Sequence, residues 1–300
     1  MRKSRFIQLG TVAIATVLAL GIGTGCSSQD INDAKHAVNT ITDIVNSLND
    51  ENANDENDGS TSSQTNDTGT DINGSGNEQA QAGEAISGQD ANAQYVATQW
   101  SMDQYPDYYR VAGKAIIDSD VQPGNIEYTG LDSLGRTQRV NGNITYKMVE
   151  DSKGWREKFD SDADKISGWG HNEKVAIEMA NGKTYHGYMY NRSHLIADSL
   201  GGAAKRINLV TGSRTQNVGS NDGKGGMAYA ETKARNYLNA HHDGTLYYCA
   251  IPVYVGNELV PRSVYVEMKS DDGSIDESIE VFNTANGYTI NYNDGTFSEN

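Results

Sequence analysis

The chain has 300 residues, of which 36% are hydrophobic and 8% aromatic, and its formal net charge is −16. Its two cysteines, Cys26 and Cys249, exclude a zinc site built from a cysteine cluster. A protein that grips nucleic acid by charge alone has a basic excess, which this chain lacks. One that works through a bound cation and a few placed arginines needs no such excess, so the charge neither supports nor excludes nucleic acid.

Residues 1–26 have the order of an export signal. Basic residues precede an apolar stretch from Phe6 to Ile22, and small residues then lead into Cys26. The run from Gly23 to Cys26 resembles a lipoprotein processing site. We therefore expect a lipid on Cys26 that holds the protein on the outer face of the cell membrane. An ordinary secretion signal, with release of the protein, is the alternative.

Residues 27–92 are rich in small polar and acidic residues and hold almost no large apolar residue after Leu48. Such a segment cannot bury enough apolar surface to fold, so we predict a disordered acidic linker. Apolar residues at steps of three and four predict a short amphipathic helix within it, from Asp33 to Leu48. That helix would self-associate, lie on the membrane or have no consequence, since so few apolar positions rarely stabilise a helix alone.

Residues 93–300 are long enough for one domain with its own core, which we place at about residues 126–281. Runs of β-branched and aromatic residues predict strands at Ile126–Tyr128, Val175–Glu178, Thr184–Tyr190, Thr245–Val255 and Ser263–Met268, and a late hairpin at Ile279–Phe282 and Tyr288–Tyr292. A helix is predicted at Met227–Ala240. This order indicates an α+β fold, with helices packed on a central antiparallel sheet.

Cys249 lies in an apolar and aromatic run, Leu246–Ile251. With Cys26 lipidated, no intrachain disulfide could form. Nothing near Cys249 in the sequence would lower its pKa. We predict a buried structural thiol and set aside a cysteine nucleophile.

Residues with catalytic potential gather between Tyr190 and Arg235. The end of a predicted strand places His194 beside Arg192, and the apolar residues that follow would bury the backbone there. A histidine held in this way can act as a base near neutral pH.

Two further groups lie downstream of this histidine. The segment from Asn208 to Asn217 has amide oxygens at both ends, and its polarity and glycine content predict that it is not a core strand. Glu231 and Arg235 are four positions apart on the predicted helix and share one face. A base, an amide oxygen, a carboxylate and arginines suit metal-assisted attack of water on a phosphodiester. The chain has neither His-Glu-x-x-His nor Gly-x-Ser-x-Gly.

At these residues the sequence resembles the DNA/RNA non-specific endonucleases with a ββα-metal site, most closely their DNA-entry nuclease and secreted DNase branch. The likeness covers about residues 126–281. It rests on Asn191-Arg192-Ser193-His194, on Asn208 and Asn217 nine positions apart, on Glu231 with Arg235 one turn beyond it, and on a lead-in segment, Tyr128–Arg136. The family's usual motif is Asp-Arg-Gly-His, from which Asn191 and Ser193 depart.

The resemblance implies that His194 is the general base and that Asn217 is the direct ligand of Mg²⁺, with Mn²⁺ as a substitute. Glu231 would hold the water shell of the ion, since Mg²⁺ keeps most of its waters. Asn208 would orient the site.

The resemblance also implies roles for four arginines. Arg192 and Arg235 would contact the scissile phosphate or support the loops around it. Arg136 and Arg139 are further candidates for substrate binding. The substrate would be DNA, with RNA as a second polymer, and no organic cofactor is implied. The oligomeric state is not indicated.

Each assignment has a structural alternative. His194 could be a hydrogen-bonded structural histidine, Glu231 and Arg235 a plain helix ion pair, and the two asparagines caps of turns. The whole domain could be a surface module that binds a polymer or a partner without catalysis. We favour a surface-anchored, magnesium-dependent endonuclease.

Overall fold

The structure is a computed structural model that describes residues 94–154, 157–159, 161–220 and 223–300. The predicted export signal, the linker and the short helix at 33–48 lie outside these residues. The strands are β1 Tyr109–Gly113, β2 Ile126–Tyr128, β3 Val140–Thr145, β4 Lys174–Glu178, β5 Thr184–Tyr188, β6 Tyr190–His194, β7 Leu209–Ser213, β8 Thr245–Val253, β9 Ser263–Ser270, β10 Asp276–Phe282, β11 Tyr288–Ile290 and β12 Phe297–Glu299. The helices are α3 Tyr146–Asp151, α4 Arg214–Val218 and α5 Gly226–Ala240, with single 3-10 turns at Ala163–Lys165, Asp198–Leu200 and Arg206–Asn208.

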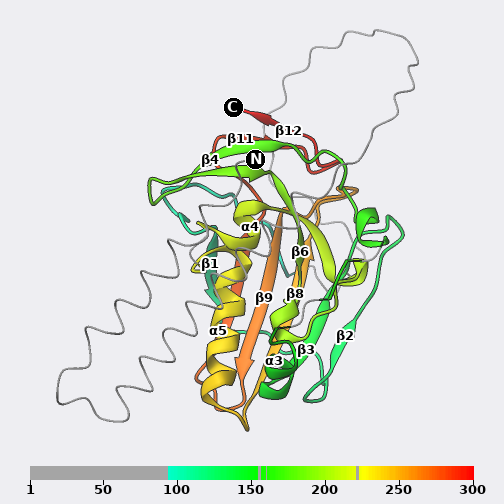
Figure 1. Ribbon diagram of the computed structural model, residues 1–300, viewed down its shortest axis with the longest axis vertical. Coiled ribbons are helices and arrows are strands. Elements are labelled where there is room, and N and C mark those ends of the chain that lie inside the picture. Colours follow the sequence, from blue (N-terminus) through cyan, green and yellow to red (C-terminus); the bar gives the residue numbers. More distant parts are fainter. Residues whose placement is uncertain (1–93, 155–156, 160, 221–222) are drawn as a thin grey trace, which may run out of the picture. The chain divides into compact units, whose positions relative to one another are not determined.

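A six-stranded sheet forms the centre of the described part, in the order β1-β10-β9-β8-β3-β2. Every neighbouring pair in it is antiparallel. The longest pairing joins β8 to β9, from Leu246 opposite Ser270 to Val253 opposite Ser263. The prediction of an α+β fold with a central antiparallel sheet is confirmed, and α5 lies along the sheet (Figure 1).

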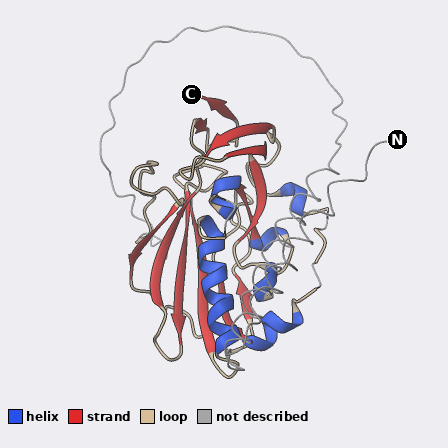
Figure 2. Cartoon of the chain, turned by 60° about the vertical axis from the view of Figure 1, so that its left-hand side comes forward, coloured by secondary structure: helices blue, strands red, loops and turns tan. Residues whose placement is uncertain are grey.

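The main core lies between the sheet and the helices, which gather on one face (Figure 2). Side chains alternate between the two faces of a strand, so Tyr248 of β8 and Val266 of β9 face this core. From α5, Ala230, Ala234 and Leu238 pack against them at the helical spacing predicted for this segment.

The opposite face of the sheet is covered by the chain before β2. Tyr95 and Val121 pack there against Cys249 and Tyr265. Cys249 is buried, and burial raises the pKa of its thiol to about 12. The cysteine is therefore the buried structural thiol that the sequence predicts.

Three two-stranded hairpins, β4–β5, β6–β7 and β11–β12, lie outside the central sheet. Two predictions made from the sequence are wrong here. The stretch Thr184–Tyr190 is interrupted at Met189, where β5 ends and β6 begins. The late hairpin does not form, because β10 pairs with β9 and β1 inside the central sheet, whereas β11 pairs with β12.

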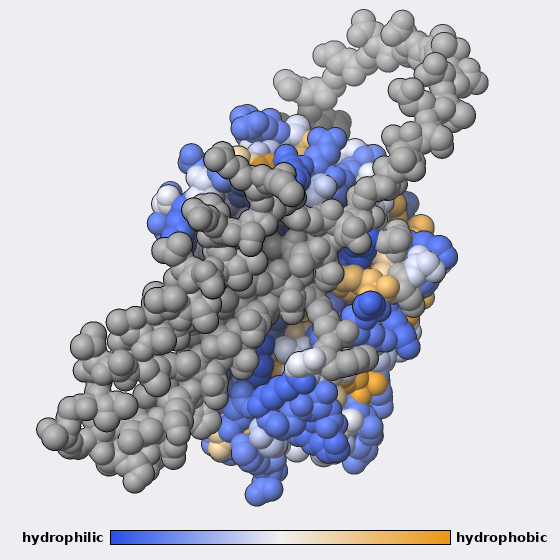
Figure 3. Space-filling model, viewed as in Figure 1, coloured by the Kyte–Doolittle hydropathy of each residue, from blue (hydrophilic) through white to orange (hydrophobic). Residues whose placement is uncertain are grey.

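The described surface that faces the viewer in Figure 3 is mostly hydrophilic, with small separate apolar patches. Among the described residues, no helix has the length and apolar character needed to cross a membrane.

Candidate active site

The β6–β7 hairpin is the base of the candidate site. Its register pairs Ser193 with Val210 and His194 with Leu209. The segment after Asn208 is thus a strand, and all five residues of β7 are buried, contrary to the prediction from its polarity. The polar groups of β7 are satisfied inside the protein, which removes the usual penalty for burying them. Thr211 Oγ1, for example, donates to the carbonyl oxygen of Ser167 at 2.8 Å.

His194 ends β6 and is only 9% exposed. The ring of Phe159 lies 5.6 Å from its ring. Arg192, two residues earlier and therefore on the same face of the strand, has its guanidinium 5.6 Å from the Phe159 ring and 4.5 Å from the Trp169 ring. Phe159 thus borders both the histidine and the arginine, Trp169 borders the arginine, and the cation–π contacts hold Arg192 in place.

Asn208 fixes the loop that follows the histidine. Its side chain is fully buried, and its Oδ1 accepts a hydrogen bond from the Ile196 amide at 3.0 Å. Its Nδ2 donates to the carbonyl oxygens of Ile196 and Ala203, both at 2.9 Å. The whole amide is used within the protein, so this geometry suits the predicted role of orienting the site.

Helix α4 starts directly at the end of β7. Ser213 is its N-cap, and the Ser213 Oγ accepts a hydrogen bond from the Gln216 amide at 3.1 Å. The loop after β10 holds this turn from outside, since Asn283 Oδ1 accepts from the Ser213 amide at 2.7 Å and the carbonyl oxygen of Thr284 accepts from Ser213 Oγ at 2.8 Å. Two antiparallel strands followed by α4 give the ββα arrangement that the resemblance implies.

Asn217 lies on α4 and contacts the strand that carries His194. Ser193 Oγ donates a hydrogen bond to Asn217 Oδ1 at 3.1 Å. Ser193 is fully buried and directly precedes His194. The structure therefore brings together Asn217 and the histidine-bearing strand, which are more than twenty residues apart in sequence.

Helix α5 carries Glu231 and Arg235 and packs closely against α4 (Figure 1). A β-carbon on Gly226, where α5 begins, would lie 2.3 Å from the carbonyl oxygen of Gln216. Burial raises the pKa of Tyr248 well above its ordinary value, and the negative charge of Glu231 adds to that shift, so the carboxylate lies near this buried phenol.

Arg235 connects α5 to the loop after His194. Its Nη1 donates to Ser199 Oγ at 3.0 Å, and its Nη2 donates to Thr232 Oγ1 at 3.3 Å. Because Ser199 belongs to the loop that Asn208 also fixes, α5 and the hairpin are joined around the same segment.

Arg136 and Arg139 contact residues outside the candidate site. Arg136 Nε donates to Asp132 at 2.6 Å, and its Nη1 donates to the carbonyl oxygens of Gly256 and Glu258. Arg139 forms an ion pair with Asp118, and its charge acts on Cys249, which lies on the sheet face opposite α5. The structure does not bring Arg139 to the candidate site, and the contacts of Arg136 favour a structural role.

The donor set near Asn217 fits a hard divalent cation. Asn217 offers an amide oxygen, and the helix packed against α4 carries the carboxylate of Glu231; Mg²⁺ prefers such oxygen ligands over sulfur or nitrogen. Within the described residues, no group of three or more His, Cys, Asp or Glu could hold a metal ion. A cation that keeps most of its waters and takes one amide ligand does not need such a group.

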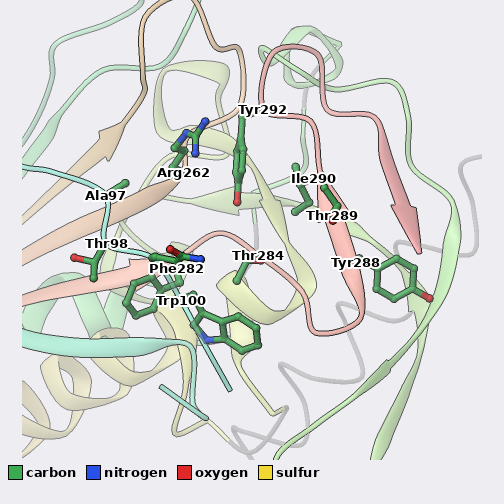
Figure 4. Close-up of a pocket in the computed structure, with 11 residues that line it drawn as sticks. Ala97, Thr98, Trp100, Arg262, Phe282, Thr284, Tyr288, Thr289, Ile290 and Tyr292 are labelled. Atoms are coloured by element: carbon green, nitrogen blue, oxygen red, sulfur yellow. The ribbon is translucent and has the colours of Figure 1, made fainter. Parts of the chain in front are cut away.

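A separate pocket of about 510 Å³ lies between the start of the described chain and the β11 strand (Figure 4). Trp100, Arg262, Tyr288 and Tyr292 line it, and none of the predicted site residues does. Thr284 also lines it, so the pocket is next to the loop that holds the start of α4.

Four contributors to the site were missed in the sequence: Phe159, Trp169, Asn283 and Gln216. The aromatic residues and Asn283 give no local signal, because their contacts to the site are long-range. Gln216 directly precedes Asn217, and this pair of adjacent amides was the available signal.

The model of the DNA/RNA non-specific endonuclease family matches residues 117–299. A deoxyribonuclease from Streptococcus dysgalactiae subsp. equisimilis is 33% identical over 252 residues, which cover 68% of this chain and 76% of that protein. Among solved structures, the Sda1 nuclease with a bound zinc ion is 38% identical, with a TM-score of 0.64 over 67% of this chain and 100% of that one.

Proposed function

The chain belongs to the DNA/RNA non-specific endonuclease family, and we propose that it is a surface-anchored, magnesium-dependent endonuclease in which His194 activates water. DNA is the proposed substrate, with RNA as a second polymer. The nuclease domain is proposed to span residues 93–300. The observation that carries the proposal is the hydrogen bond from Ser193 to Asn217, which joins the predicted metal ligand to the strand that ends at His194.

In the proposed reaction, His194 takes a proton from water as the water oxygen bonds to phosphorus, and the bond between phosphorus and the leaving oxygen breaks. The buried backbone around His194 and the ring of Phe159 hold the imidazole in a fixed orientation. Arg192 and Arg235 would contact the scissile phosphate or keep the neighbouring loops in place, as their contacts to Trp169 and Ser199 indicate.

Asn217 Oδ1 would bind Mg²⁺, and Glu231 would accept hydrogen bonds from the waters around the ion. Bound Mg²⁺ would supply positive charge to stabilise the charge that develops on the phosphate oxygens and on the leaving oxygen. Mn²⁺ would substitute, since it prefers the same hard oxygen ligands.

The first test is cleavage of plasmid DNA and of RNA by the full chain, with Mg²⁺ and with a chelator. We expect His194→Ala and Asn217→Ala each to lower the cleavage rate by at least about 100-fold, because the general base contributes that much and the cation stabilises the same reaction step. His186→Ala and Asn239→Ala, changes of the same residue types outside the site, should cleave as the parent does.

Either of two results would contradict the proposal. Parental cleavage by His194→Ala would show that the base is misassigned. Absence of cleavage by the folded parent, with either polymer and with Mg²⁺ or Mn²⁺, would favour the alternative of a non-catalytic surface module that binds a polymer or a partner.

The location is proposed from the sequence. We expect a lipid on Cys26 to keep the protein at the extracellular face of the cell membrane. Cell fractionation of the producing organism should show the parent with the membranes and a Cys26→Ala variant in the medium or unprocessed. Mass spectrometry of the mature N-terminus distinguishes these outcomes, and an unlipidated mature parent would show that the anchor does not exist.

A further inference from the structure

Gln216 is buried in the candidate site, and no described residue bonds to its side chain. It is 0% exposed, and neither its Oε1 nor its Nε2 has a hydrogen-bond partner among the residues that the structure describes. Its backbone amide is used in the cap of α4. Burying an amide without partners is costly, so a group outside the described protein atoms is expected to satisfy it.

The Gln216 amide lies beside the predicted metal ligand. A β-carbon added to Gly212 would lie 2.2 Å from Gln216 Oε1 and 2.7 Å from the β-carbon of Ser193. Gly212 is therefore required for space, since any larger residue would displace the Gln216 amide or Ser193. Because Ser193 donates to Asn217 Oδ1, the amide groups of Gln216 and Asn217 adjoin the same buried serine.

A second amide without a described partner lies on the same face of the hairpin. Asn191 pairs with Gly212 in the β6–β7 register, and it is two residues before Ser193, so both side chains point to one face. Asn191 Oδ1 is buried and has no partner among the described residues. Gln216 and Asn191 thus offer two neutral amide oxygens on the hairpin face that carries Ser193, the residue that donates to Asn217.

We propose that Gln216, assisted by Asn191, is a positioning residue for the hydrated cation that Asn217 binds. The amide oxygens accept hydrogen bonds from the waters around the ion and so orient its water shell. The proposal rests on the proposed function, because it requires a cation at Asn217. It explains why the chain keeps a glycine at position 212 and a buried amide that the fold itself does not use.

The test compares Gln216→Met with the parent in the full chain. Methionine keeps the size of the side chain but removes its hydrogen-bonding groups. We expect Gln216→Met to weaken Mn²⁺ binding, measured by titration calorimetry, by about tenfold or more, as is usual for residues that orient metal ligands. The melting temperature of the metal-free protein should stay the same or rise, because an unsatisfied amide has been removed.

A merely structural role predicts the opposite pair of results, a lower melting temperature of the metal-free protein with unchanged Mn²⁺ affinity, and that outcome would overturn the proposal. Gln138→Met is the matched control, since the Gln138 amide donates to the carbonyl oxygen of Arg136, outside the site.

If Gln216→Met does not fold, Gln216→Glu provides the second variant. Its added carboxylate should tighten Mn²⁺ binding, and unchanged or weaker binding would count against the proposal.

Asn217→Ala separates this inference from the proposed function. Suppose that the parent binds Mn²⁺ and that Asn217→Ala does not. If Gln216→Met then binds Mn²⁺ as tightly as the parent does, only the role of Gln216 is wrong. If the parent does not bind Mn²⁺, or Asn217→Ala binds it as well as the parent, the metal site itself is misplaced and the role of Gln216 is wrong with it.

Discussion

Two side chains of the candidate site, those of Asn208 and Arg235, hold the loop that follows His194 in place. Asn208 makes three hydrogen bonds to Ile196 and Ala203, and Arg235 donates one to Ser199 in the same loop. Asparagine can do this because its amide is both donor and acceptor. The catalytic geometry proposed for His194 thus depends on a residue whose side-chain amide is used within the protein.

Asn208→Ala should lower the free energy of unfolding by about 2 to 4 kcal/mol, because it removes the hydrogen-bond partner of backbone groups of the buried Ile196 and the partly buried Ala203. Urea unfolding of parent and variant measures this change. Asn236→Ala, at an exposed position on α5, should change stability by less than about 0.5 kcal/mol. If Asn208→Ala also lowered the free energy of unfolding by less than about 0.5 kcal/mol, other contacts would hold the loop.

At the scale of elements, the site depends on how α5 meets α4. Gly219 and Gly226 both have positive φ, at 55° and 57°, a conformation that glycine adopts without strain. Both also lie where the two helices come into contact, since a β-carbon on Gly219 would be 2.5 Å from the Cα of Gly225. These glycines let the helix with Glu231 approach the helix with Asn217.

Gly226→Ala should destabilise the protein more than Gly256→Ala does. Both glycines have positive φ, so each substitution costs about 1 to 2 kcal/mol of backbone strain. At Gly256 a β-carbon would meet nothing within 4 Å, whereas at Gly226 it would strike the carbonyl oxygens of Gln216 and Thr215. We expect only Gly226→Ala also to weaken metal-dependent cleavage. If both variants lowered the melting temperature equally, the contact between α4 and α5 at Gly226 would contribute nothing to stability.

For the described part as a whole, buried carboxylates fasten the chain before β2 to the central sheet. Glu280 accepts hydrogen bonds from the Thr98 amide at 2.7 Å and from Arg110 Nε at 2.8 Å. Glu267 accepts from the Ile116 amide and from Ser278 Oγ, both at 2.8 Å. Both carboxylates are fully buried, so this face of the sheet contains buried acidic groups that hold the preceding chain in place.

Glu267 gives a pH dependence with a definite sign. Burial raises the pKa of its carboxyl above the ordinary 4.5, despite the hydrogen bonds from Ile116 and Ser278 that act to lower it. The folded protein therefore binds this proton more tightly than the unfolded chain does, and ionisation of Glu267 costs stability as pH rises through the raised pKa.

Glu267→Gln removes that cost. Relative to the parent, the free energy of unfolding of the variant should be constant below pH 4.5 and should increase toward neutral pH. Urea unfolding at a series of pH values measures the difference. Glu299→Gln, at an exposed position, controls for the loss of one charge, and a relative stability that falls toward neutral pH would contradict the assignment.

The sequence by itself determined the elements whose signal is local. Runs of β-branched and aromatic residues marked β2, β8 and β9, and the helix predicted at Met227–Ala240 matches α5 to within one residue. The family motif and its spacing predicted Asn191 to His194, Asn208, Asn217, Glu231 and Arg235 as candidate site residues, and the structure brings together β6, β7, α4 and α5, which carry or adjoin them. Such signals are readable because each depends on neighbours a few positions away.

Only the tertiary structure decided the rest. The polar strand β7 is buried because its partners come from far along the chain, such as Asn283, which is 70 positions from Ser213. Arg139 directly precedes β3, and its side chain acts on Cys249, on the face of the sheet opposite the one to which Val140 contributes. The buried amide of Gln216 became visible only through its packing against Gly212 and Ser193. Each outcome depends on long-range pairing and on which polar groups are satisfied in the folded chain, and neither can be read from a local pattern.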